Sequence, residues 1–151
     1  MRNLTSFKLF KLKTTKILNL TIFSLFILLL TSCSTKLTFL NSSVVPAAQG
    51  AVKVSKDDNN NYSLDVSVTN LAEPSRLQPK KELYVVWLVT KENITKNVGQ
   101  LKSSSGFFSS TLEGKLTTVS PFKPEYVFIT AEDSAAILYP VGTVILTTKV
   151  N

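Results

Sequence analysis

The stretch ELYVVWLVTK, residues 82–91, decides the fold class. Successive side chains of a β-strand point to opposite faces of the sheet. Here both alternating sets are apolar: Tyr84, Val86 and Leu88 alternate with Val85, Trp87 and Val89. This pattern predicts a central strand that is covered on both faces, with Trp87 in the core.

Shorter strands are expected on either side of this segment. AVKVS (51–55) and YSLDVSVTN (62–70) alternate apolar and polar residues, and KDDNNN (56–61) supplies a turn, which predicts an antiparallel hairpin. Pro121 and Pro124 allow no more than a short helical turn over residues 120–125. Further candidate strands are NVGQLK (97–102), GFFSSTLEG (106–114), YVFITAE (126–132) and TVILTTKV (143–150). About seven short strands predict an all-β, immunoglobulin-like antiparallel β-sandwich.

The amino terminus has the features of a lipoprotein signal peptide. Five basic residues and no acid precede an apolar block over residues 17–30, which is short for a membrane-spanning helix of roughly 20 residues. The order Leu30-Thr31-Ser32-Cys33 then resembles a bacterial lipobox, in which the cysteine is lipidated and becomes the first residue. The alternative is an ordinary cysteine after a short transmembrane anchor. We predict a signal peptide over 1–32, lipidation at Cys33, a lipidated tether over 33–49 that is rich in Ser and Thr and could end in a first edge strand, and a β-sandwich domain over 50–151.

Lipidation would place the mature chain in the cell envelope. Two or three acyl chains hold a protein firmly at a bilayer where one chain does not. Ser34 stands where an aspartate would indicate retention in the inner membrane, so we expect the outer membrane, facing the periplasm, in a Gram-negative cell. The expected partners are the membrane, through Cys33, and an unidentified envelope protein.

The charge of the chain does not indicate a nucleic-acid ligand. The net charge is +7, but five of the 17 basic residues and none of the 10 acids precede Cys33. Removal of residues 1–32 leaves 12 basic and 10 acidic residues, a net charge of +2. Because these basic residues are scattered, with Lys80-Lys81 the only adjacent pair, we expect no nucleic-acid binding.

The residues needed for most catalytic sites are missing. The sequence contains no histidine, and its one cysteine is assigned to the lipid, which excludes Ser-His-Asp and Cys-His catalysis and the usual zinc sites. We therefore predict no enzyme, no catalytic residue, no metal site and no cofactor. The acidic run at 57–61 lacks the spacing and glycine of a calcium loop and is interpreted as a polar turn. A small carboxylate-dependent hydrolase remains a third function hypothesis, through Glu113, Glu125, Glu132 and Asp133.

The remaining aromatic residues allow two interpretations. They could line a sugar-binding or peptide-binding surface, or they could fill the space between two sheets, which is the more common role and the one we expect. These residues are Phe107, Phe108, Phe122, Tyr126, Phe128 and Tyr139.

From residue 71 onward, the order of features resembles the extracytoplasmic C-terminal domain of the anti-sigma-K factor family. The segments are LAEPSRLQPKKELYVVWLVT (71–90), NVGQLK, GFFSSTLEGKL (106–116), YVFITAEDSA (126–135) and YPVGTVILTT (139–148). The matching positions are Leu71, Tyr84, Trp87, Leu88, Val98, Gly99, Gly114, Thr130, Glu132, Pro140 and Gly142. The resemblance implies a β-sandwich in which these residues mainly determine folding, with Gly99 and Gly142 at turns and Glu132 as a weak candidate for partner contact.

Sigma-factor binding is not expected, because the family's cytoplasmic sigma-binding region has no counterpart in this sequence. We therefore predict a lipid-anchored envelope β-sandwich that acts as a non-enzymatic binding or sensory and regulatory module. A structural envelope lipoprotein without a specific ligand is the alternative.

Overall fold

The computed structural model describes residues 34–105 and 112–150 of the 151-residue chain. The chain divides into two units, Met1–Ser32 and Cys33–Asn151, and every described residue belongs to the second. The predictions for Cys33, Phe107 and Phe108 therefore lie outside the described residues. Among the described residues, no helix has the length and apolar character needed to cross a bilayer.

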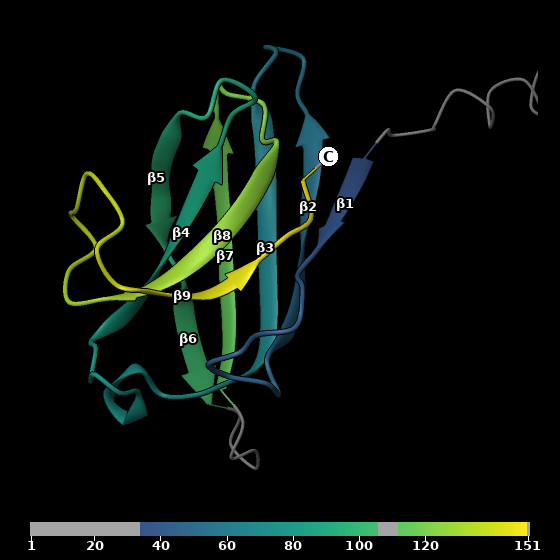
Figure 1. The fold of residues 1–151 in the computed structure, drawn as a ribbon. Coiled ribbons are helices and arrows are strands. Elements are labelled where there is room, and N and C mark those ends of the chain that lie inside the picture. The colour runs from purple at the N-terminus through teal and green to yellow at the C-terminus, as the bar shows by residue number, and fades with distance from the viewer. Residues whose placement is uncertain (1–33, 106–111, 151) are drawn as a thin grey trace, which may run out of the picture. The chain divides into compact units, whose positions relative to one another are not determined.

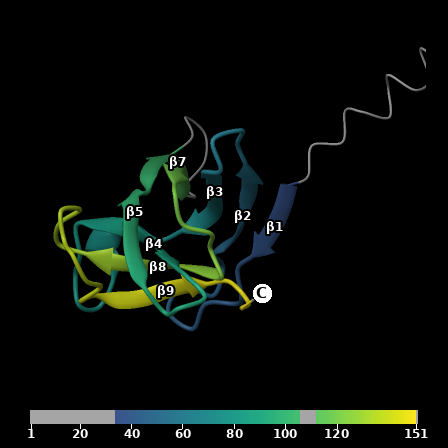
Figure 2. The same ribbon diagram turned by 90° about the horizontal axis from the view of Figure 1, so that it is seen from above.

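The described residues form two antiparallel sheets that face each other (Figure 1; Figure 2 gives the view from above). In spatial order, the first sheet contains β1 (Ser34–Thr38), β2 (Gln49–Lys56), β3 (Tyr62–Leu71), β7 (Leu112–Ser120) and β6 (Lys102–Ser105). The second contains β5 (Thr95–Gln100), β4 (Leu83–Val89), β8 (Tyr126–Glu132) and β9 (Thr143–Thr147). The predicted all-β antiparallel sandwich is confirmed, with nine strands in the described residues instead of about seven.

The strand order is that of an immunoglobulin-type domain. The row β2-β3-β7-β6 corresponds to strands A-B-E-D, and the row β5-β4-β8-β9 corresponds to C′-C-F-G. The first strand, β1, extends the first sheet beyond β2 and pairs with it in antiparallel register. The β8–β9 loop, residues 133–142, therefore has the F–G position, which in antibody variable domains belongs to the binding site.

The core lies between the two sheets, and β4 is its central element. Tyr84, Val86 and Leu88 belong to this core, whereas Trp87 and its neighbours Val85 and Val89 are buried on the opposite face of the same strand. Complete burial of one valine or leucine side chain stabilises a folded domain by about 1.5–3 kcal/mol relative to leaving it exposed. The prediction of a strand covered on both faces, with a buried Trp87, is confirmed.

The interpretation of residues 33–49 as a tether is wrong for the described part of that range. Residues 34–38 form β1, in which Leu37 lies opposite Val52 of β2, and both Leu37 and Phe39 are buried in the core. The backbone N–H of Phe39 donates to Gly50 O at 3.1 Å. Three of the Ser and Thr residues that suggested a tether, Ser34, Thr35 and Thr38, occupy exposed positions of this edge strand. The folded domain therefore includes residues from Ser34 onward.

Two connections test the expectations for turns. In the turn over residues 57–61, the carboxylate of Asp57 accepts the backbone N–H groups of Asn59 (2.9 Å) and Asn61 (2.8 Å), and Asn60 has φ 64°, so the predicted polar turn is confirmed. The short helical turn that the sequence allowed at 120–125 is not formed. Because β7 continues to Ser120 and β8 begins at Tyr126, the short segment between them only carries the chain from one sheet to the other.

Candidate binding site

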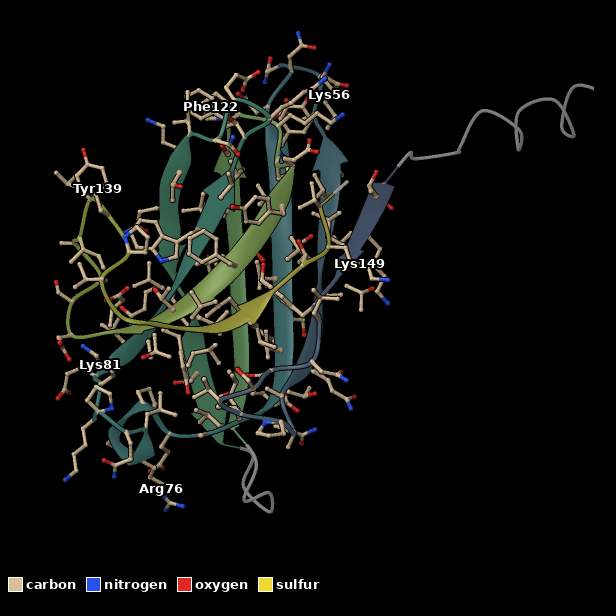
Figure 3. The ribbon with its side chains drawn as sticks, in the orientation of Figure 1. Lys56, Arg76, Lys81, Phe122, Tyr139 and Lys149 are labelled. Atoms are coloured by element: carbon tan, nitrogen blue, oxygen red, sulfur yellow. The ribbon has the colours of Figure 1, made fainter. Side chains whose placement is uncertain are left out.

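The β8–β9 loop exposes an apolar tip, which we define as Leu138, Tyr139 and Val141. Their exposed fractions are 81%, 73% and 83%, the highest among the large apolar side chains of the described residues. Figure 3 shows Tyr139 directed away from the domain at the outer side of this loop. Exposed apolar clusters on folded proteins commonly mark interaction sites.

The stem of the loop is fixed by the carboxylate of Glu132, at the end of β8. Its two oxygens accept the backbone N–H groups of Val141 (3.1 Å) and Gly142 (2.8 Å). The hydroxyl of Thr130 donates to the same carboxylate at 2.7 Å. Hydrogen bonds to an ionised acceptor are stronger than those between neutral groups, so this carboxylate closes the loop at its base.

A buried side chain of the central strand orients this carboxylate. The indole N–H of Trp87 donates to Thr130 Oγ1 at 2.8 Å, and the Thr130 hydroxyl hydrogen is then directed at Glu132. Trp87 and Thr130 are fully buried, and Glu132 is only 2% exposed. A continuous chain of hydrogen bonds therefore runs from β4 through β8 to the base of the loop.

Glycine is required at position 142 by close packing. A Cβ at this position would collide with the carbonyl oxygen of Ala131 and would lie 2.8 Å from Glu132 Oε2. Only a residue without a side chain can place its N–H this close to the carboxylate. The resemblance placed Gly142 at a turn; it ends the loop directly before β9.

Two further contacts hold the loop. The side-chain amide of Asn97, on β5 opposite Trp87, donates to the carbonyl oxygens of Ala135 and Ile137, both at 2.9 Å. Lys81, from the β3–β4 connection, forms an ion pair with Asp133 at 2.7 Å. The loop is therefore fastened at its base and along its first half, and within the described residues the side chains of the tip take part in none of these hydrogen bonds or ion pairs.

Gly99 takes part in the placement of Asn97. It has φ +133° and lies at an irregularity in the β4–β5 pairing, and its N–H donates to Asn97 Oδ1 at 3.0 Å. The expectation that Gly99 occupies a turn is therefore wrong: it occupies a β-bulge, a common position for glycine at positive φ.

Glu132 is not placed to contact a partner directly. Its side chain is almost completely buried, and both carboxylate oxygens accept hydrogen bonds from the chain itself. The hypothesis that Glu132 itself contacts a partner is therefore wrong. Glu132 can affect binding only indirectly, by holding the β8–β9 loop in place. Cys33 lies outside the described residues, and its lipidation stays a prediction.

The carboxylates of the hydrolase hypothesis are not brought together. Glu125 and Glu132 lie at opposite ends of β8, and Glu113 lies on β7 of the other sheet. Asp133 is exposed and paired with Lys81. Within residues 34–105 and 112–150, no three His, Cys, Asp or Glu side chains lie close enough to hold a metal ion.

Of the six aromatic residues with two possible roles, the four that the structure describes lie outside the main core. Phe122 and Tyr139 are exposed, and Tyr126 and Phe128 are half-buried on the outer face of the second sheet, so the expected core packing is wrong for these four. The ring of Phe128 stacks beside that of Trp87, with centroids 6.2 Å apart. This arrangement follows from the period of β8, because Val127 and Ile129 occupy the inner face.

Comparisons with protein-family models, with curated proteins and with solved structures find no match. The fold and the loop define an immunoglobulin-type β-sandwich with a fastened apolar F–G loop. What this domain does must be inferred from its own residues.

Proposed function

We propose that this protein is a lipid-anchored, non-enzymatic binding module of the cell envelope, attached through Cys33, that binds a protein partner with the apolar tip of its β8–β9 loop. One observation carries the proposal: the tip side chains are 73–83% exposed, while the stem of the same loop is fastened by buried hydrogen bonds. This combination favours binding over the alternative of a structural lipoprotein, whose anchoring role would not require an exposed apolar loop.

A fastened loop is suited to binding for an energetic reason. Ordering a flexible loop on association costs free energy, and a loop that is already held in one conformation avoids most of that cost. Burial of Leu138 and Val141 in an apolar cleft would contribute about 1.5–3 kcal/mol for each side chain. Tyrosine is among the residues that most often dominate binding energy at interfaces. We therefore expect Tyr139 to lie at the centre of the interface with the partner.

We propose further that the domain is related to the extracytoplasmic domain of the anti-sigma-K factor family. Four of the residues that carry the resemblance, Trp87, Thr130, Glu132 and Gly142, belong to one hydrogen-bonded network. Their spacing therefore has a common physical cause, which supports a shared fold rather than a chance series of matches.

The test uses a photo-crosslinking amino acid in the full-length protein in its native cells. At position 139 we expect one discrete adduct with an envelope protein, and the adduct should disappear in the variant Leu138→Ser/Val141→Ser. The matched control position is Val119, which is 60% exposed on β7 of the other sheet. Equal adducts at both positions, or no adduct at position 139, would contradict binding through the loop.

A further inference from the structure

Membrane attachment at Cys33, as proposed above, would place the start of β1 beside the membrane. Ser34 already belongs to β1, paired with Ser55 of β2. Its Cα is about 3.8 Å from that of Cys33, because consecutive Cα atoms are separated by this distance across a trans peptide. No tether separates the folded domain from Cys33. The same holds if residues before Cys33 span the membrane, since Ser34 would then be among the first residues outside it.

This side of the domain is lined by lysines. Three surface hollows include residues of β1 in their walls, and between them they contain five lysines and a single carboxylate, Asp65. All five lysines are exposed, and none forms an ion pair with another described residue. We define them as the β1 lysines: Lys36, Lys53, Lys56, Lys123 and Lys149.

The β1 lysines lie on the outer face of β1, along its free edge and beside its first residues. Lys36 and Lys53 are direct neighbours across the β1–β2 pairing and lie on the outer face of the sheet. Lys56 and Lys123 line a hollow of about 300 Å³ that reaches Thr35, two residues after Cys33. Lys149 lines a hollow along the free edge of β1. Figure 3 shows Lys56 and Lys149 on the side of the domain opposite Tyr139.

This side of the domain carries an excess of positive charge. The five lysines are accompanied by Asp65, by Asp57 and Asp58 in the turn after Lys56, and by Glu125 two residues after Lys123, which gives a local charge of +1. In the walls of the three hollows themselves, five lysines stand against one carboxylate. Basic residues next to a membrane attachment point favour anionic lipid surfaces.

We propose that the surface formed by the β1 lysines rests on the bilayer and binds the headgroups of anionic phospholipids. The inference deepens the proposed function, because it depends on membrane attachment next to Ser34, but it does not depend on a partner for the loop. It fixes the orientation of the domain: β1 faces the membrane, and the apolar tip faces away from it.

Lysine acetylation by a water-soluble reagent tests this orientation. The full-length protein is extracted from its native membranes and reconstituted into phosphatidylcholine vesicles with or without phosphatidylglycerol, and labelling is read residue by residue by mass spectrometry. With phosphatidylglycerol, labelling of the β1 lysines should slow at least threefold, whereas Lys80 and Lys102, on the β3–β4 connection and on β6 at the far edge of the sheet, should be labelled at unchanged rates. The protection should vanish in about 1 M salt, where the Debye length is about 3 Å.

A charge-neutralised pair provides the matched comparison. The variant Lys36→Gln/Lys53→Gln should lose most of the protection of Lys56 and Lys123, and Lys80→Gln/Lys102→Gln should keep it. Protein that floats with the vesicles but shows no selective protection would overturn the inference and leave binding through the loop intact. Protein that does not float would overturn membrane attachment and this inference together.

Discussion

Replacing Glu132 with glutamine should lower the free energy of unfolding by about 2–3 kcal/mol. Three donors share this buried carboxylate: the Thr130 hydroxyl and the N–H groups of Val141 and Gly142. Glutamine keeps one acceptor oxygen but presents an NH₂ group at the other position, so at least one donor loses its partner. A hydrogen bond to a charged group contributes about 1.5–3 kcal/mol, and its neutral counterpart about half as much. Water can replace part of the loss, because Val141 is exposed.

The single tryptophan of the chain provides the assay. Trp87 is fully buried and belongs to the same network, so its fluorescence reports unfolding of the domain directly. For a domain of this size, with an m value of about 1.5–2 kcal/mol/M, the expected loss moves the urea midpoint down by roughly 1–2 M. Glu82→Gln is the matched control, because Glu82 is exposed although its backbone N–H donates to Glu132 O. This control should stay within about 0.5 kcal/mol of the parent.

Proteolysis separates the stability of the domain from the fastening of the loop. In Glu132→Gln, chymotrypsin should cut the loop after Leu138 several times faster than in the parent, under conditions where both proteins are folded. A midpoint equal to that of Glu82→Gln would refute the assigned role of the carboxylate. A lower midpoint without faster cleavage would show that Glu132 stabilises the sandwich but does not hold the loop.

Three other substitutions test further contacts of the domain. Gly142→Ala should lower the thermal midpoint at least as much as Glu132→Gln, because its Cβ collides with Ala131 O; an unchanged midpoint would refute the close packing. Asp133→Asn should cost less than about 1 kcal/mol in urea unfolding, since Asp133 is 68% exposed. Burial raises the pKa of Tyr84 to about 12 from 10.0. The neutral phenol therefore contributes fully below pH 10, and about 2–3 kcal/mol is lost as the pH rises through 12; Tyr84→Phe should remove this pH dependence.

The central part of the fold was predictable because burial leaves a clear pattern in the sequence. Residues 84–89 are apolar in both alternating sets, and a strand covered on both faces requires this pattern. The hairpin of β2 and β3 was predictable for a similar reason, since its polar and apolar residues alternate around a turn rich in Asn and Asp.

Two segments were predicted less well because their patterns are weaker. The candidate strand over 106–114 includes only the start of β7, which continues to Ser120. The inward positions of β7 include Gly114, which packs beneath Leu101 and Leu71, so the apolar alternation is interrupted by a residue without a side chain. In β1, only Leu37 and the following Phe39 mark the buried face, and the neighbouring Ser and Thr residues suggest a tether. Such strands are specified mainly by the neighbours with which they pair.

The site was only partly predictable. The resemblance selected Thr130, Glu132 and Gly142, but the burial of the carboxylate depends on a chain segment that returns nine or ten residues later. The run Leu138-Tyr139-Pro140-Val141, between the end of one strand and the start of the next, was available in the sequence as an indication of the tip. The tip is exposed because no described part of the domain packs over it. A local sequence pattern carries no information about such tertiary packing.

The position of the tip relative to Ser34 restricts the kind of partner that can bind it. Ser34 pairs near the 57–61 turn, whereas the β8–β9 loop follows Glu132, which pairs with Leu83 at the β3–β4 end of the sandwich. Figures 1 and 2 both show β1 and this loop on opposite sides of the domain. In the proposed attachment at β1, the domain presents its tip on the side away from the bilayer. A partner in the same membrane must then carry its apolar cleft on a domain that extends past this one.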